Sequence, residues 1–369
     1  MLMLITAAAL ATTPANERAL YAGLCERVAA SFDSARGGFV ERGVPCESAV
    51  ELGLILGHGA RKSSWTARSL ATIAWTRGLR DTVGGGFLLG AAQVGSAPAE
   101  FLKRTDSNAR RLENLVQAWR LMADSRYRAE AAQVVDYMDR VLLDGRGGFL
   151  AGQTADIDLD PRANGYAIRA WLSWAAATGD LAKRDFAARS LDRVWETCWV
   201  PEVGLIRRGT FGEGTSEPQL ADQAEMGRAL VLAARLIGRG RDAARARALG
   251  EILLHRFADP EKGGFRTRFA TTRGGKPKRA PRVAAENARA ALFLCELGTL
   301  SGEARYRVAA RGAWSSFGKG FGKAGLEAAD WALALRAALE PELPVVPRWP
   351  RRPHASADRR SISFRPSGR

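Results

Sequence analysis

The chain has 369 residues, of which 46% are hydrophobic and 25% charged, as in an ordinary globular protein rather than a disordered or fibrous one. No run approaches eighteen consecutive apolar residues, so the sequence contains no candidate for a membrane-spanning helix. The formal net charge is +16, which makes nucleic acid a partner to test and gives weight to where the basic residues lie.

The positive charge is concentrated in two segments. Residues 266–282 carry seven Lys or Arg and no acid, and residues 343–369 carry seven Arg against one Asp. Few aromatic residues accompany the basic ones in 266–282, so we do not expect a nucleic-acid site that stacks bases. An acidic partner, or solvent alone, is the expectation for this loop. The Pro/Arg-rich tail, residues 341–369, is expected to be disordered.

The N-terminal segment, residues 1–16, is apolar and ends in small residues, as a short export signal does. It lacks the basic start of such a signal, so we favour a cytoplasmic protein and keep export, with residues 1–15 as the signal, as the alternative. The four cysteines are scattered without a Cys-x-x-Cys pair. We therefore expect free thiols, no metal site and no dithiol redox motif.

Helical periodicity dominates the rest of the chain, with apolar residues at i, i+3, i+4 and i+7. At most short strands are expected, in the loops. Twelve helices are predicted, in chain order at 17–32, 47–59, 63–78, 108–122, 126–142, 164–178, 181–197, 222–237, 240–257, 287–300, 303–317 and 325–339.

A Gly-Phe dipeptide, once Gly-Leu, recurs through the chain and indicates a repeat. The six copies end at Phe39, Phe87, Phe149, Leu205, Phe265 and Phe321. The first and last helices have no partner unless the chain closes on itself. Six closed hairpins form an all-α (α/α)6 toroid of six-hairpin glycosidase type, here over residues 17–340. Helices that follow a Gly-Phe loop are apolar on most sides and are expected to form the inner ring, with the pocket at the end where these loops gather.

Several stretches, in this order, resemble the helical part of the thioredoxin-domain-containing, spermatogenesis-associated protein 20-like family. They include "NARRLENLVQAWRLMADSRYRAEAAQVVDYM" (108–138), "NGYAIRAWLSWAAATGD" (164–180) and "ENARAALFLCELGTLSGEARYR" (286–307). That part of the family is similar to six-hairpin glycosidases and N-acylglucosamine 2-epimerases, so the resemblance implies a sugar-type toroid. The family's thioredoxin half is not found here. Its His-Phe-Glu-Lys is replaced by "EFLK" at 100–103.

Four carboxylates are the candidate catalytic residues, because glycoside hydrolysis needs an acid and a base across a cleft. Asp222 and Glu225 share one face of an inner helix, and Asp156 and Asp158 follow a Gly-Phe loop. The alternatives are a capping box for the first pair and solvated turn residues for the second.

Three amides at the starts of inner helices are the candidate substrate-binding residues: Asn108, Asn164 and Asn287. Their alternative role is helix capping.

The sequence thus predicts a carbohydrate-active toroid that hydrolyses a small or acidic glycan, without cofactor or metal. A catalytically degenerate toroid that serves as a binding or scaffold module is the alternative, and the altered residues at 100–107 favour it. A sugar epimerase ranks below both, because it would need two imidazoles. The chain has three histidines, none of them placed in the expected pocket.

Overall fold

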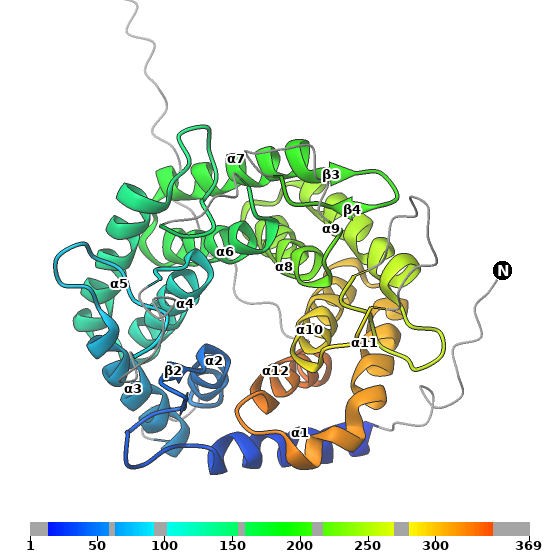
Figure 1. The fold of residues 1–369 in the computed structure, drawn as a ribbon, viewed down its shortest axis with the longest axis horizontal. Helices are drawn as coiled ribbons and strands as arrows, with labels where there is room; N and C mark the ends of the chain where they lie inside the picture. Colours follow the sequence, from blue (N-terminus) through cyan, green and yellow to red (C-terminus); the bar gives the residue numbers. More distant parts are fainter. Residues whose placement is uncertain are drawn as a thin grey trace, which may run out of the picture.

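The computed structural model describes residues 14–58, 63–91, 102–153, 159–208, 217–268 and 280–341. Within these residues, twelve α-helices alternate between an outer and an inner ring (Figure 1). The outer helices are α1 (Pro14–Ala30), α3 (Ser64–Thr76), α5 (Ser125–Tyr137), α7 (Leu181–Cys198), α9 (Gly240–Ile252) and α11 (Ala304–Phe317). The inner helices are α2 (Glu47–Leu56), α4 (Thr105–Met122), α6 (Pro161–Thr178), α8 (Leu220–Ile237), α10 (Ala284–Ser301) and α12 (Ala328–Leu339).

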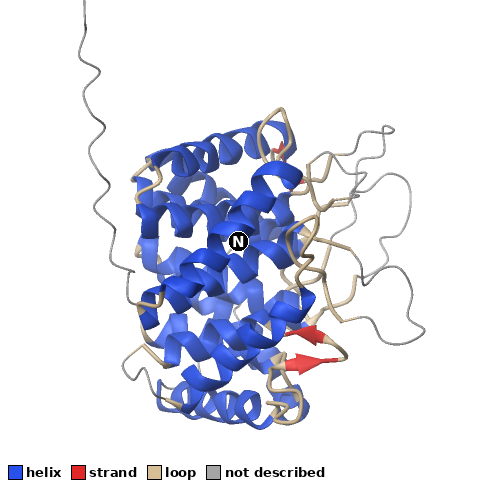
Figure 2. Ribbon diagram, turned by 90° about the vertical axis from the view of Figure 1, so that its left-hand side faces the viewer, coloured by secondary structure: helices blue, strands red, loops and turns tan. Residues whose placement is uncertain are grey.

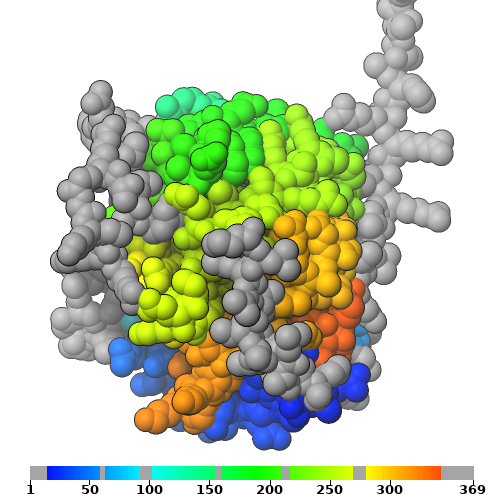
Figure 3. Space-filling view, turned by 90° about the vertical axis from the view of Figure 1, so that its right-hand side faces the viewer, coloured from blue at the N-terminus to red at the C-terminus, as the bar shows by residue number. Residues whose placement is uncertain are grey.

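The ring closes between the two ends of the chain. Each inner helix contacts the next, and α12 returns to contact α2. Helix α1 packs on α12, and Arg311 of α11 binds Glu17 of α1 at 2.5 Å. Figure 3 shows this seam, where the blue N-terminal helix meets the orange C-terminal segment. The predicted all-α (α/α)6 toroid is therefore confirmed.

The connections into the inner helices gather at one side of the ring, which we call the loop end (Figure 2). They contain two small antiparallel hairpins, β1 (Val40–Glu41) with β2 (Val44–Pro45) and β3 (Trp199–Val200) with β4 (Gly204–Leu205). Short 3-10 or π turns close four of the outer helices at η2 (Arg77–Leu79), η4 (Met138–Leu142), η5 (Leu253–Phe257) and η6 (Gly318–Lys323).

An amide side chain from the following inner helix clamps four of the six Gly-Phe loops. Asn164 accepts a hydrogen bond from the Phe149 amide at 2.9 Å and donates one to the Phe149 carbonyl at 2.8 Å. Equivalent pairs of bonds join Asn108 to Phe87, Gln223 to Leu205 and Asn287 to Phe265. The preceding glycine makes the turn at positive φ, as at Gly148 (φ 89°), which favours glycine. The aromatic or leucine side chain is then buried.

Four inner helices, α4, α6, α8 and α10, begin two or three residues earlier than predicted, whereas α2 begins where predicted and α12 three residues later. The clamping amides lie in the first turn, and the N-cap of α6 is Asp160, whose carboxylate accepts from the Ala163 amide. Helices α4 and α10 have no side-chain cap. The amide side chains that a local capping rule would assign to the helix N-cap therefore bind the Gly-Phe loop instead.

Helices α6 and α8 approach each other closely at Gly165 of α6. A Cβ at this position would lie 2.7 Å from the Glu225 carbonyl carbon of α8. Because only a residue without a Cβ fits there, Gly165 sets the distance between α6 and α8 and so positions the side chains that project towards the axis.

Candidate functional site

Six side chains, one from each inner helix, form a layer across the axis of the toroid that we call the axial ring. They lie two residues after the clamping amide or its equivalent position in each repeat. The axial ring consists of Ser48, Arg110, Tyr166, Glu225, Arg289 and Asp330.

Contacts run round the whole axial ring. Arg289 joins Glu225 (2.6 Å) to Asp330 (3.4 Å). Ser48 donates to Asp330 at 2.5 Å and accepts from Arg110. The Arg110 guanidinium lies over the Tyr166 ring, 5.7 Å from its centroid, and the Tyr166 hydroxyl donates to Glu225 at 2.8 Å. The circuit therefore ties all six inner helices together at one level.

Glu225 is the most constrained member of the axial ring. Its carboxylate is 1% exposed and is bound by Arg289, by Arg169 (3.1 Å) and by Tyr166. Burial alone would raise the pKa of Glu225, but Arg289, Arg228 and Arg169 outweigh burial and hold it far below its usual range. A carboxylate with both oxygens held this way stays ionised and cannot donate a proton, so its contacts fit a structural role.

A cavity of about 380 Å³ opens at the loop end, on the side of α2, α4 and α6. We call it the loop-end cavity. It is bordered by the first turns of these three helices, whose backbone N–H groups carry partial positive charge. Its charged and hydroxyl-bearing lining residues are Glu47, Arg104, Asp106, Ser107, Arg110, Arg111, Arg162 and Tyr166.

Most charges in the loop-end cavity are paired, and one is not. Arg111 binds Glu47 at 2.8 Å. Arg104 binds Asp106 at 2.9 Å, and Arg162 lies 3.6 Å from the same carboxylate. Arg110 has no ion pair with any carboxylate in the described residues, and its polar partner is the Ser48 hydroxyl. The cavity therefore carries more positive than negative charge.

Asp222 lies at the same end of the ring but is fully buried. Arg207 donates a hydrogen bond to each of the two Asp222 carboxylate oxygens, at 2.9 and 2.8 Å. Arg207 also lies 3.5 Å from Asp160. Burial raises the pKa of Asp222 to about 6, against the opposing effect of Arg207. The group is therefore ionised at neutral pH, with its lone pairs committed to a guanidinium.

Glu286, in the first turn of α10, differs from the other carboxyls in the first turns of the described inner helices because it is unpaired. It is half-buried and makes no hydrogen bond or ion pair with the described residues. Burial raises the pKa of Glu286, while Arg162 and Arg207 oppose this effect. A carboxyl whose pKa is raised by burial and that has no fixed partner is suited to proton donation.

The structure does not bring the predicted site residues together around one cavity. Asp222 and Glu225 are each engaged by arginines, and Asn108, Asn164 and Asn287 are buried and bonded to backbone. None of these five lines the loop-end cavity. Asp156 and Asp158 lie outside the described residues, as do 269–279 of the basic loop and 342–369 of the tail.

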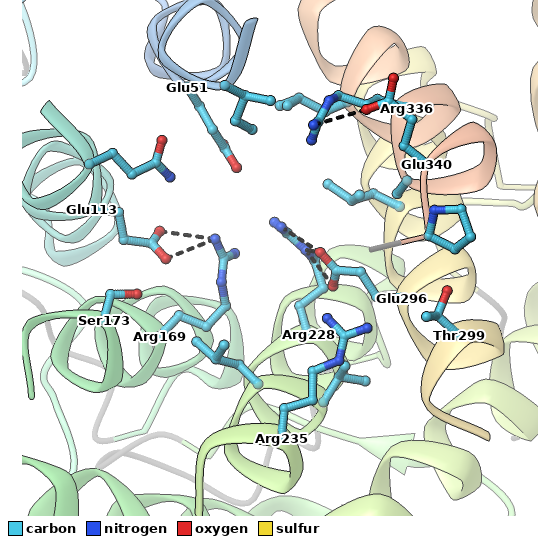
Figure 4. Close-up of a pocket in the computed structure, with 18 residues that line it drawn as sticks. Glu51, Glu113, Arg169, Ser173, Arg228, Arg235, Glu296, Thr299, Arg336 and Glu340 are labelled. Atoms are coloured by element: carbon cyan, nitrogen blue, oxygen red, sulfur yellow. Dashed lines mark hydrogen bonds and ion pairs between the residues drawn. The ribbon is translucent and has the colours of Figure 1, made fainter. Parts of the chain in front are cut away.

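A second cavity, the axial chamber, lies on the other side of the axial ring from the loop end, because its lining residues come three or more positions later on each inner helix. Figure 4 shows these lining side chains. Its volume is about 240 Å³, and it shares no lining residue with the loop-end cavity. It is lined by the C-terminal halves of the inner helices. Its charged lining residues are Glu51, Glu113, Glu296, Glu340, Arg169, Arg228, Arg235 and Arg336.

Sequence reasoning missed the axial chamber because it looked for chemistry only near the Gly-Phe loops. A signal was present. Five residues after the clamping amide, or its counterpart in α2, stand Glu51, Glu113, Arg169 and Arg228 in otherwise apolar helices. Charged residues that occupy the same position in successive inner helices must all point to the axis of the toroid. There they are buried, and a buried charge needs an oppositely charged partner or a ligand.

The remaining site classes find little support in the part of the chain that the structure describes. No group of three or more His, Cys, Asp or Glu side chains there is arranged to hold a metal ion. Among the same residues, no helix is long and apolar enough to cross a membrane.

Comparison with known proteins places the fold among sugar enzymes. No family model matches the chain, and no curated protein matches it in sequence. A D-mannose isomerase structure matches with a TM-score of 0.72 at 12% identity, over 89% of this chain and 98% of that one. A sugar epimerase from a ruminal bacterium gives 0.69 at 13%, over 82% and 86%. The family 76 α-mannanase BT2949 of Bacteroides thetaiotaomicron gives 0.65 at 12%, over 89% and 98%. The chain thus has the toroid fold of epimerases and six-hairpin glycosidases, whereas the resemblance to the spermatogenesis-associated protein 20-like family stays a prediction.

Proposed function

We propose that the protein is a carbohydrate-active toroid that takes a small anionic saccharide into the loop-end cavity and hydrolyses it. The observation that carries the proposal is Arg110, a guanidinium without a carboxylate partner that lines a cavity bordered by helix N-termini. A carboxylate or phosphate on a sugar would supply the missing charge. The volume of about 380 Å³ suits a small saccharide rather than a long polymer.

Hydrolysis requires a proton donor and a second carboxylate about 5–10 Å away across the glycosidic bond. We assign the donor role to Glu286, which does not line the loop-end cavity but interacts electrostatically with Arg162, which does. Burial raises the pKa of Glu286, and its oxygens are free of fixed partners. Asp156 and Asp158 stay the proposed second carboxylate. We give Asp222 the role of fixing Arg207, because its own oxygens are occupied.

A binding module without catalysis is the second candidate. The observation that favours it is the engagement of Asp222 and Glu225 by arginines, which leaves Glu286 as the carboxyl with free oxygens in the first turns of the described inner helices. Epimerisation ranks lower. His58 and His255 line neither cavity, and His354 lies outside the described residues.

The test compares matched neutral and anionic saccharides, such as galactose-based and galacturonate-based disaccharides, for binding and for release of reducing ends. We expect the anionic member to bind more tightly, with an affinity that falls as salt is added. Arg110→Gln should weaken its binding at least tenfold, because a charge-assisted hydrogen bond contributes about 1.5–3 kcal/mol. Glu286→Gln should abolish hydrolysis and preserve binding.

Arg126→Gln is the matched control, because this arginine lies on the outer helix α5 in an exposed pair with Asp124. Equal affinity for neutral and anionic sugars would refute the anionic substrate. Anionic binding without hydrolysis by the wild type would decide for the binding module. Undiminished hydrolysis in Glu286→Gln would remove this residue from the mechanism.

A further inference from the structure

The axial chamber holds polar groups that nothing in the described protein satisfies. Glu113, Glu296 and Glu340 are each paired, with Arg169 at 3.0 Å, Arg228 at 3.0 Å and Arg336 at 3.0 Å. Glu51 and Arg235 have no ion pair and no hydrogen-bond partner in the described residues. The same is true of the side chains of Gln117 and Ser173. These four groups come from four different inner helices and all line one chamber.

Figure 4 shows how these groups are disposed. Glu51 reaches from α2 towards the middle of the chamber, and Arg228 and Arg235 reach inward from α8 on the opposite side. Arg228 is 5% exposed, and its Nη1 is buried without a hydrogen-bond acceptor. The Nε of Arg235 is likewise buried without an acceptor. Donors and an acceptor thus face one another across a space without bonding to each other.

The charge balance of the chamber argues against a charged occupant. Four glutamates and four arginines line it, so it carries no net charge for an ion to neutralise. Burial alone would raise the pKa of Glu51, yet Arg228, Arg289 and Arg169 hold it below its ordinary value. Glu51 is therefore an ionised acceptor in a positive field, which favours hydroxyl donors over a cation.

The wall of the chamber is partly apolar. Ile55, Val231, Leu232, Leu292 and Leu333 line it beside the charged groups. A sugar or cyclitol ring has the matching character, with C–H groups on its faces and hydroxyls at its edge. The volume of about 240 Å³ lies below the range for drug-sized ligands and limits the occupant to about one such ring.

We propose that the axial chamber is a second binding site, for one neutral polyol ring of hexose size. Adjacent hydroxyls of the ring donate to the Glu51 carboxylate, Gln117 of the neighbouring helix α4 binds a hydroxyl beside them, and Arg235 binds a hydroxyl on the opposite edge. The site goes beyond the proposed function and is independent of it, because it lies across the axial ring from the loop-end cavity and would take an uncharged ligand.

The experiment titrates the full-length protein with D-glucose, D-mannose and myo-inositol, followed by calorimetry or ligand-observed NMR. At least one of these should bind, with an affinity that does not change with salt. Glu51→Gln should weaken that binding about tenfold or more, since it removes a charge-assisted acceptor. Ser173→Leu should have a similar effect by filling the space. Glu26→Gln, an exposed change on α1, should leave binding unchanged.

Two results would overturn the proposal. One is that none of the three polyols binds the folded wild type at the highest soluble concentration. The other is binding that survives both Glu51→Gln and Ser173→Leu in variants that melt cooperatively, since this would place the ligand elsewhere. Salt dependence separates the two sites, because binding at the loop-end cavity is expected to weaken with salt and binding in the axial chamber is not.

Discussion

Replacement of Asn164 by alanine is the sharpest test of the role that the structure gives to the clamping amides. Asn164 is fully buried and bonds both backbone groups of Phe149. Alanine would leave that N–H and C=O in the core without partners, at about 1–3 kcal/mol for each unsatisfied group. The side chain of Asn164 also donates a third bond, to the Asp160 carbonyl at 3.0 Å. The backbone amide of Asn164 donates to the same carbonyl, so losing the third bond adds little to the destabilisation.

We therefore expect Asn164→Ala to lower the free energy of unfolding by roughly 3 kcal/mol. With an unfolding entropy of about 2.1 cal/mol/K per residue, a chain of this size should melt about 4 °C lower. Urea unfolding followed by far-UV circular dichroism measures the first quantity, and calorimetry the second. Gln133→Ala, an exposed amide on α5, is the control and should change neither.

The alternative, that Asn164 holds substrate, predicts the reverse pattern. A ligand-binding amide could be removed with a loss of affinity and a stability change below about 1 kcal/mol. That outcome would refute the clamp and restore the role that the sequence first indicated for Asn108, Asn164 and Asn287.

Three further predictions concern the axis and the thiols. Glu225→Gln should cost about 3–5 kcal/mol of stability, because it leaves Arg289 and Arg169 buried without their shared carboxylate; a loss under 1 kcal/mol in urea titrations would contradict this. The pKa of Glu225 in the folded protein lies below its ordinary value of 4.5, so its stabilisation is present above pH 4.5 and is lost as the pH falls further. Acid titration of the unfolding free energy should accordingly be shallower in the Gln variant than in the wild type. Gly165→Ala places a Cβ 2.7 Å from the backbone of α8 and should destabilise by about 1–3 kcal/mol or more, measured by thermal melting; an unchanged Tm would mean that α6 and α8 can separate without cost. Burial raises the pKa of the Cys198 thiol to about 12, so a thiol reagent at pH 8 should leave it unmodified in the native state and label all four cysteines after unfolding; rapid native labelling of Cys198 would show that the core opens there.

Periodicity and repetition were enough to predict the architecture. Helix type depends on the spacing of apolar residues along the chain, and the six Gly-Phe copies mark the return of each outer helix to the inner ring. The apolar spacing and the Gly-Phe repeat are both local properties of the amino-acid sequence. Closure followed from counting, since an open array would leave two apolar faces unpaired.

The partners of polar side chains could not be predicted in the same way. Asn164 has the sequence context of a cap, and Asp222 with Glu225 that of a capping box, but each bonds a group distant in the sequence or on a neighbouring element. Asp222 meets Arg207, and Glu225 meets Arg289, 64 residues away. A capping rule compares only neighbouring residues, so it cannot anticipate an arginine that comes from an adjacent helix or loop.

The sequence by itself therefore determined the ring, the order of its helices and the end at which the loops gather. Only the tertiary structure decided which charges neutralise one another and which are left free. Arg110, Glu286, Glu51 and Arg235 became candidates because closure of the ring paired their neighbours and not them. The physical reason is that helix formation responds to local periodicity, whereas the reactivity of a buried charge depends on every charge that the fold brings within a few ångströms of it.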